Sequence, residues 1–177
     1  MIPPNPGRPA LFELEELIMN QKSLAVWLKV ILIGVGLCGL VVFFVIFPAY
    51  GRSLAEEAPE FENRYWPWLV FLWISAVPCY AALVFGWFIA CNIGRDRSFS
   101  EENAKHLRVI SWLAAGDAAF FFTGNIVLLF LDMSHPGVTL ASLIVVFGGV
   151  AVTVAAAILS HLVRKAAALQ EQSDLTI

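Results

Sequence analysis

The sequence predicts an all-α integral membrane protein, a four-helix bundle with both termini in the cytoplasm and short interfacial amphipathic helices. Three observations predict this fold. The chain of 177 residues contains four long apolar runs. Hydrophobic residues make up 59% of it and charged residues 14%, whereas soluble domains contain about 45–50% apolar and about 25% charged residues. Lysine and arginine are concentrated in segments that four spans would place on one side of the membrane.

The four apolar runs are long enough to cross a bilayer. Val30–Tyr50, Tyr65–Gly94 and Gly137–Ser160 contain no lysine, arginine, aspartate or glutamate, and Val109–Leu131 contains only Asp117. A helix needs about 20 residues to cross a hydrocarbon core of about 30 Å, and in lipid it satisfies its backbone polar groups internally. We therefore expect a transmembrane domain over residues 24–163, with spans at about 24–47, 66–92, 108–131 and 138–162.

The charged residues give these spans a direction. The segment up to Lys29, the loop 95–108 and the tail 164–177 hold nine of the eleven lysine and arginine residues. Arg52 and Arg64 lie on the other side. Positive residues in short loops favour the cytoplasmic side, so the sequence predicts that both termini are cytoplasmic.

The N-terminal segment, residues 1–23, is expected to lie in the cytoplasm and to contain an interfacial helix. Leu11, Leu14, Leu17 and Ile18 share one face of a helix. Such an amphipathic helix can lie flat on the membrane surface.

A second amphipathic helix is expected to lead into the third span. Two pairs of residues fit the spacing of a helix N-cap: Ser98 with Glu101 and Ser100 with Asn103. From Phe99 onward, residues recur at helical spacing. At the other end of the chain, no glycine or proline follows Gly149, so the fourth helix should continue into the cytoplasmic tail, residues 164–177.

Asp117 is the acidic residue that the runs place at membrane depth. It follows Leu107 by ten residues, which is roughly 15 Å along a helix and near the bilayer midplane. An acid at this depth is expected to face the bundle, either protonated or with a partner. The candidate partners are Asn125 on the same helix and Ser75, Tyr80 or Thr153 on others.

Two interpretations of this intramembrane polar site, Asp117 with Asn125, remain open. The acid is either a neutral donor of an interhelical hydrogen bond or a proton-titrating or ion-binding site. The first is favoured, because a proton or ion pathway normally uses several polar groups.

Other chemistry is not indicated. Cys38, Cys79 and Cys91 have no metal or redox spacing and are interpreted as small packing residues. His106 and His161 both lie near the inner interface, but a haem or metal site is not favoured, and no cofactor is expected. Hydrolase, phosphate-loop and dinucleotide motifs are absent, so we expect no enzyme. A net charge of −3 without a basic stripe argues against direct binding of nucleic acid.

Two cytoplasmic motifs resemble a known family. Phe99-Ser-Glu-Glu-Asn103-Ala-Lys-His-Leu107 precedes the third span, and Leu169-Gln-Glu-Gln-Ser-Asp174-Leu-Thr-Ile177 ends the fourth helix. With four spans in the same places, they resemble the bacterial membrane family called domain of unknown function 2975. The resemblance implies a multi-pass protein of the bacterial plasma membrane.

The resemblance also implies a role. Members of that family are often encoded beside a small helix-turn-helix DNA-binding protein, which implies a membrane partner that holds or signals to a cytoplasmic transcriptional regulator. In this sequence the partner surface would consist of Phe99, Glu102, Asn103, Leu107, Asp174, Leu175, Thr176 and Ile177.

The sequence therefore predicts an interaction or regulatory module. The alternative is a small transporter, or an ion-coupled or proton-coupled component, that uses Asp117. Membrane lipids are expected partners, and stripes of small residues on the spans would permit a homo-oligomer.

Overall fold

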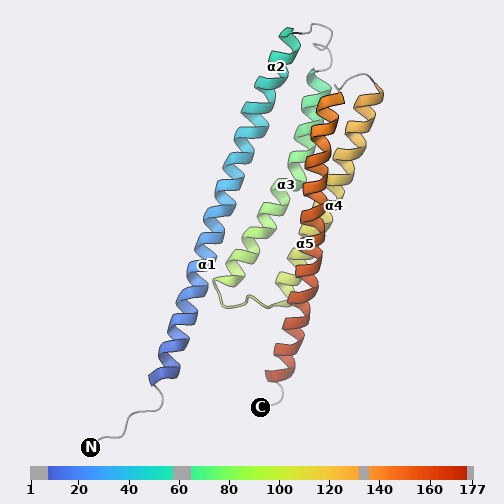
Figure 1. Cartoon of the computed structure of the whole chain (residues 1–177). Coiled ribbons are helices and arrows are strands. Elements are labelled where there is room, and N and C mark those ends of the chain that lie inside the picture. Colours follow the sequence, from blue (N-terminus) through green and yellow to red (C-terminus); the bar gives the residue numbers. More distant parts are fainter. Residues whose placement is uncertain (1–7, 58–64, 132–135, 175–177) are drawn as a thin grey trace, which may run out of the picture.

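The structure, a computed structural model, describes residues 8–57, 65–131 and 136–174. These residues form α1 (Arg8–Val41), η1 (Val42–Ile46), α2 (Phe47–Glu57), α3 (Tyr65–Ile93), α4 (Glu101–Phe130) and α5 (Pro136–Asp174). The first three elements follow one another without a break, as one long rod (Figure 1).

Four helices in this part of the chain are long and apolar enough to cross a membrane: Gln21–Ser53, Tyr65–Ile93, Glu101–Phe130 and Gly137–Ser173. The predicted all-α membrane fold is therefore confirmed. The expected spans lie within these helices, except that residue 131 follows the end of α4.

The expected N-terminal segment is continuous with the first span. α1 begins at Arg8 and runs through residue 23 without interruption. The side chains of the expected interfacial face, from Leu11 to Ile18, lie outside the side chains that the structure describes.

A π-helical turn, η1, accommodates Pro48. Proline lacks an N–H, and in an α-helix its ring would crowd the carbonyl of the residue four positions earlier. In η1 the N–H of Phe47 instead bonds the carbonyl of Val42, five residues back. The next carbonyl in this register belongs to Phe43, and Pro48 cannot donate to it. The indole Nε1 of Trp73 on α3 donates to that carbonyl at 3.1 Å.

A second aromatic donor joins α3 to α1. The hydroxyl of Tyr80 donates to the carbonyl of Gly36 at 3.0 Å. A Cβ at Gly39 would lie 2.9 Å from the Tyr80 hydroxyl oxygen, so this glycine allows the close approach. α3 therefore holds the first span through side-chain bonds to backbone carbonyls.

α4 and α5 pack along a seam of small and polar residues. The hydroxyl of Ser160 donates to the carbonyl of Ala104 at 2.7 Å, and that of Ser111 donates to the carbonyl of Thr153 at 2.9 Å. A Cβ at Gly149 would lie 3.1 Å from Ala118. Small residues allow such close backbone approach in lipid, where dispersion contacts and hydrogen bonds drive helix association.

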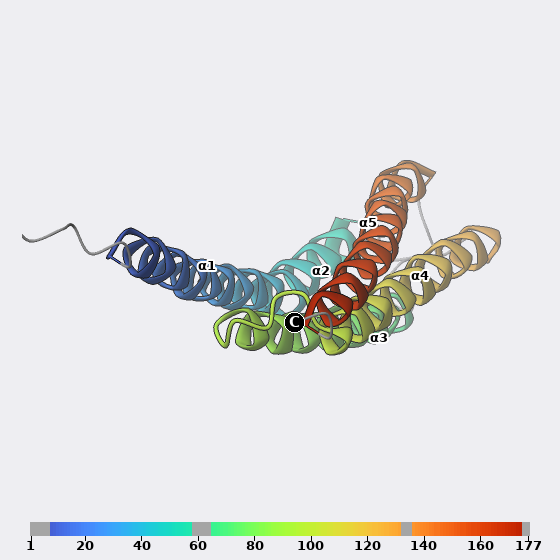
Figure 2. The same ribbon diagram turned by 90° about the horizontal axis from the view of Figure 1, so that it is seen from below.

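The helices pack as a row. α1 packs on α3, α3 on α4, and α4 on α5, and among the described residues α1 packs on neither α4 nor α5. Seen from below, α1 and α2 lie beside α3, and α5 lies along α4 (Figure 2). Much of the apolar surface of α1 and α5 is therefore exposed to whatever surrounds the molecule.

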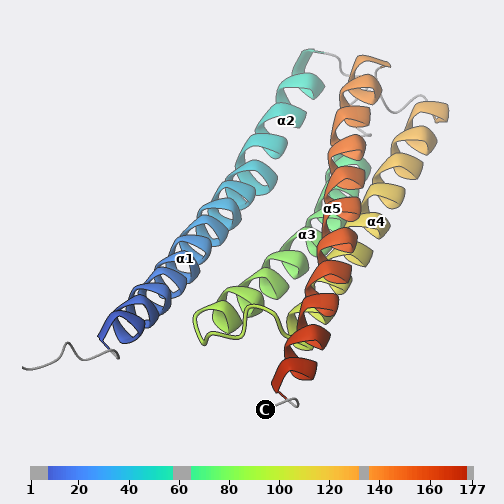
Figure 3. The ribbon, with the colours of Figure 1, turned by 60° about the horizontal axis from the view of Figure 1, so that its bottom comes forward.

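One end of the molecule combines three segments that are distant in sequence. The start of α1, the connection between α3 and α4, and the end of α5 all lie at this end (Figures 1 and 3). We call it the termini end.

Candidate functional sites at the termini end and within the membrane

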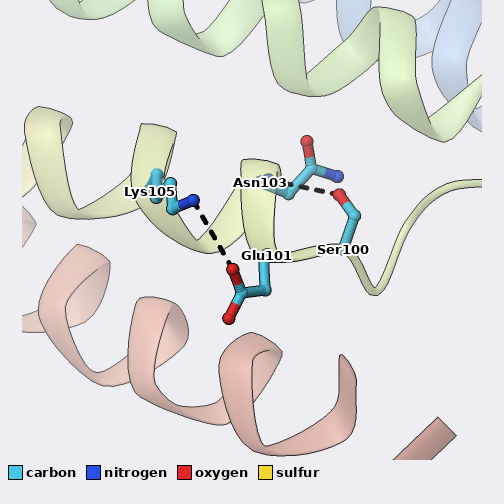
Figure 4. A network of polar contacts seen from close by, with 4 residues as sticks. All are labelled: Ser100, Glu101, Asn103 and Lys105. Carbon is cyan, nitrogen blue, oxygen red and sulfur yellow. Dashed lines mark hydrogen bonds and ion pairs between the residues drawn. The ribbon is translucent and has the colours of Figure 1, made fainter. Parts of the chain in front are cut away.

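A polar clamp fixes the connection between α3 and α4. Ser100 caps α4, because its Oγ accepts a hydrogen bond from the N–H of Asn103 at 3.2 Å (Figure 4). One of the two expected N-caps is thereby confirmed. The Asn103 side chain turns back into the loop, where its Nδ2 donates to the carbonyls of Arg97 and Ser98, both at 3.0 Å. Its Oδ1 accepts from Nδ2 of Asn92 on α3 at 2.9 Å.

The loop backbone is also bonded to the end of α3. The carbonyl of Asn92 accepts from the N–H groups of Arg95 and Arg97 at 3.1 and 3.0 Å. Asp96, between them, has a φ of 61°. This left-handed conformation is uncommon outside glycine, although aspartate tolerates it better than most residues. The loop is thus held in one conformation from both sides.

A cavity of about 560 Å³ lies at the termini end. It is lined by Gln21 of α1, by the loop segment Asp96–Glu101, and by Ala167, Gln170 and Glu171 of α5. Ser98 Oγ donates to Oε1 of Gln21 at 3.3 Å, which ties the loop to α1. The cavity therefore exists because three separate parts of the chain meet.

The cavity lining is mixed in polarity. Asp96, Glu101 and Glu171 contribute carboxylates and Arg97 contributes a guanidinium. Glu101 also forms an exposed ion pair with Lys105 at 3.5 Å (Figure 4); such surface pairs add little stability. The Phe99 side chain, at 60% exposure, adds an apolar surface that the chain itself leaves uncovered.

Of the residues that the sequence assigned to the partner surface, some are exposed in the structure and others are buried. Phe99 and Glu102 are exposed. Asn103 is fully buried, at 0% exposure, and Leu107 is buried at 9%. Asn103 belongs to the polar clamp, and Leu107 packs in a core cluster with Ala104 and Val163. Leu175, Thr176 and Ile177 lie outside the described residues, as does the side chain of Asp174.

Asp117 lies between α3 and α4. Its Oδ1 accepts a hydrogen bond from Ser75 Oγ at 2.8 Å, and its Oδ2 accepts one from Cys79 Sγ at 3.4 Å. Ser75 was one of the expected partners. Asn125 is bonded elsewhere, because its Nδ2 donates to the carbonyl of Phe121, one turn earlier on its own helix, at 2.8 Å.

The other expected partners of Asp117 also bond elsewhere. The Tyr80 hydroxyl bonds Gly36 of α1, and Thr153 Oγ1 donates to the carbonyl of Gly149 at 2.9 Å. Cys79, which the sequence suggested was a packing residue, is the partner that was missed. The signal was present, since Ser75 and Cys79 are four residues apart and share one helix face.

In the part of the chain that the structure describes, no three His, Cys, Asp or Glu side chains lie close enough together to hold a metal ion. The His106 ring lies against Phe85 and Phe88, with ring centroids 5.7 and 5.6 Å away. It is packed as an aromatic residue.

Comparison with known proteins gives the chain its family. The sequence model of the family described as "Protein of unknown function (DUF2975)" matches residues 49–177. The chain belongs to this family. It is also similar to the "Uncharacterized membrane protein YoaS" of Bacillus subtilis (strain 168), with 26% identity over 163 residues, which are 90% of this chain and 100% of that protein. No solved structure matches the chain.

The DUF2975 match confirms the resemblance that the sequence motifs indicated. It includes both motifs, the one that begins at Phe99 and the one that ends at Ile177. With four candidate spans and a relative named as a membrane protein, the chain is a multi-pass membrane protein of the DUF2975 family.

Proposed function

We propose that this DUF2975 protein is an interaction or regulatory module of the bacterial plasma membrane. It holds or signals to a cytoplasmic transcriptional regulator through its termini end. The distribution of lysine and arginine supports a cytoplasmic location for that end. The observation that carries the proposal is the exposed Phe99 beside a cavity built from α1, the α3–α4 loop and α5.

Three properties of this surface support a role in binding a protein partner. Exposed aromatic side chains that a partner covers are frequent anchors of binding energy. The Asn103 clamp holds the loop that carries Phe99, so little conformational entropy remains to be lost on binding. The cavity volume of about 560 Å³ falls within the range of about 300–1,000 Å³ that is usual for ligand sites.

The charges favour one kind of partner segment. Three carboxylates and one guanidinium line the cavity, so a segment with lysine or arginine beside an apolar side chain would complement it. Electrostatic complementarity of this kind sets specificity and association rate more than affinity.

The proposal is tested by crosslinking in native membranes with a Phe99→Ser variant. If Phe99 is an anchor, recovery of the crosslinked cytoplasmic partner falls by about tenfold or more, since an anchor contributes more than about 1.4 kcal/mol. Leu169→Ser is the matched control, because Leu169 is an exposed apolar residue near the end of α5 that does not line the cavity.

Equal recovery of the same cytoplasmic proteins with the wild type and both variants would show that Phe99 contacts no partner. Equal losses with Phe99→Ser and Leu169→Ser would indicate nonspecific hydrophobic capture.

A further inference from the structure

The cluster of Ser75, Cys79 and Asp117 has chemistry that the proposed interaction surface does not use. It joins α3 to α4 within the spans, with both oxygens of the Asp117 carboxyl group bonded to α3. By helix rise it lies about 15 Å along α4 from Leu107, which is near the depth of a bilayer midplane. The nearest polar groups are therefore its whole hydrogen-bonding environment.

Among the side chains that the structure describes, no cationic group lies beside the acid. On α3, Cys79 is the titratable residue that faces Asp117. On α5, residues 148–160 contain no titratable side chain, and α1 does not pack on α4 in the described part of the chain. On α4 itself, the neighbouring titratable residue towards the termini end is Arg108, nine positions earlier. A permanently ionised Asp117 would lack a counter-charge at a depth where charges are costly.

The two partners of Asp117 can serve both protonation states of its carboxyl group. A hydroxyl and a thiol each donate and accept hydrogen bonds, whereas an ammonium, a guanidinium or an amide N–H only donates. With an ionised acid, Ser75 and Cys79 both donate, as in the structure. With a protonated acid, the new O–H donates to Ser75 Oγ while Cys79 still donates to the other oxygen.

Ser75 has an acceptor ready for its own proton in the second state. A serine hydroxyl within a helix can donate to the backbone carbonyl four residues earlier, which here belongs to Phe71. Neither state of the acid leaves a buried polar group without a partner, and such a group would cost about 1–3 kcal/mol.

The cluster lies at the edge of the helix pair. Cys79 is exposed and Asp117 is half-buried. α1 and α5 do not meet over the α3–α4 contact.

We propose that Asp117 is a reversible proton-binding site within the membrane, with Ser75 as the residue that positions its proton. A proton adds to one carboxylate oxygen, the Ser75 hydroxyl rotates to accept the resulting O–H bond, and its own hydrogen turns to the Phe71 carbonyl. Release reverses these steps. This site is independent of the partner surface around Phe99.

Infrared difference spectroscopy tests the proposal on the purified full chain in phosphatidylcholine vesicles. Spectra are recorded from acidic to alkaline pH, and those of Asp117→Asn are subtracted to remove the other carboxyl groups. We expect the carbonyl band of a protonated acid to be replaced reversibly by carboxylate bands as the pH rises. The Asn variant should remain folded, because its amide can donate to Ser75 Oγ and accept from Cys79.

Two serine variants separate a proton site from a structural contact. Ser75→Ala should shift the midpoint of the infrared transition, because it removes the group that bonds one protonation state. Ser111→Ala should leave the midpoint unchanged, since Ser111 bonds the carbonyl of Thr153 on α5. A protonated band that persists over the whole pH range in which the protein stays folded, or carboxylate bands at every pH, would overturn the proposal.

Discussion

Asn103 organises a surface to which it does not itself belong. The spacing of Ser100 and Asn103 was enough to predict an N-cap, because that motif is local. The direction of the Asn103 side chain was not predictable. Its amide bonds two loop carbonyls and Asn92 of another helix, and these partners depend on how α3 returns to α4. Sequence reasoning assigned Asn103 to the partner surface. In the structure its side chain is buried.

Replacing Asn103 by alanine should destabilise the protein by about 1–3 kcal/mol, because the carbonyls of Arg97 and Ser98 lose their buried donors. Thermal unfolding in detergent measures this effect. Glu102→Ala is the control, since Glu102 is the exposed neighbour. Equal unfolding temperatures for the two variants would mean that the amide does not hold the loop.

In the rod formed by α1, η1 and α2, the geometry of one turn depends on a neighbouring helix. The apolar run predicted a helix here, but the local disturbance before Pro48 was not predicted. The nature of the disturbance depends on a residue far away in sequence, because Trp73 bonds the carbonyl that Pro48 leaves without a donor. A π-helical turn is tolerated when a neighbouring helix supplies the missing bond.

Pro48 and Trp73 should therefore be energetically coupled. Trp73→Phe should cost about 1–3 kcal/mol of stability in detergent, because the Phe43 carbonyl loses its donor. In a Pro48→Ala background the same change should cost much less, since alanine restores a backbone N–H. A double-mutant cycle by thermal unfolding measures the difference. Additive effects of the two changes would refute the proposed role of Trp73.

At the scale of the whole molecule, composition and charge were sufficient to predict four membrane helices but not how they pack. In a soluble bundle, polar residues mark the outside of each helix. In lipid both faces are apolar: Ala76 is buried at 6% exposure while its neighbour Val77 is 67% exposed. For the same reason the packing of α1 on α3 alone left no pattern in the sequence.

The two functions considered for the whole molecule make opposite predictions. If the protein is an interaction module, deleting Ser173–Ile177 should abolish capture of the cytoplasmic partner while the protein still inserts into membranes. A transporter that uses Asp117 should tolerate this deletion and lose activity on Asp117→Asn. Crosslinking and pull-down from native membranes distinguish them, and an unchanged set of captured proteins after the deletion would count against the interaction module.

The arrangement of the helices in a row has a consequence for synthesis of the protein. The ribosome delivers α1 before α3, the helix on which it packs. During that interval α1 must be stable in the bilayer without a protein neighbour. The fold is consistent with this requirement, since none of the 18 residues in the most apolar window of the helix Gln21–Ser53 is buried. α1 is thus suited to insert into the membrane before α3 is present to pack on it.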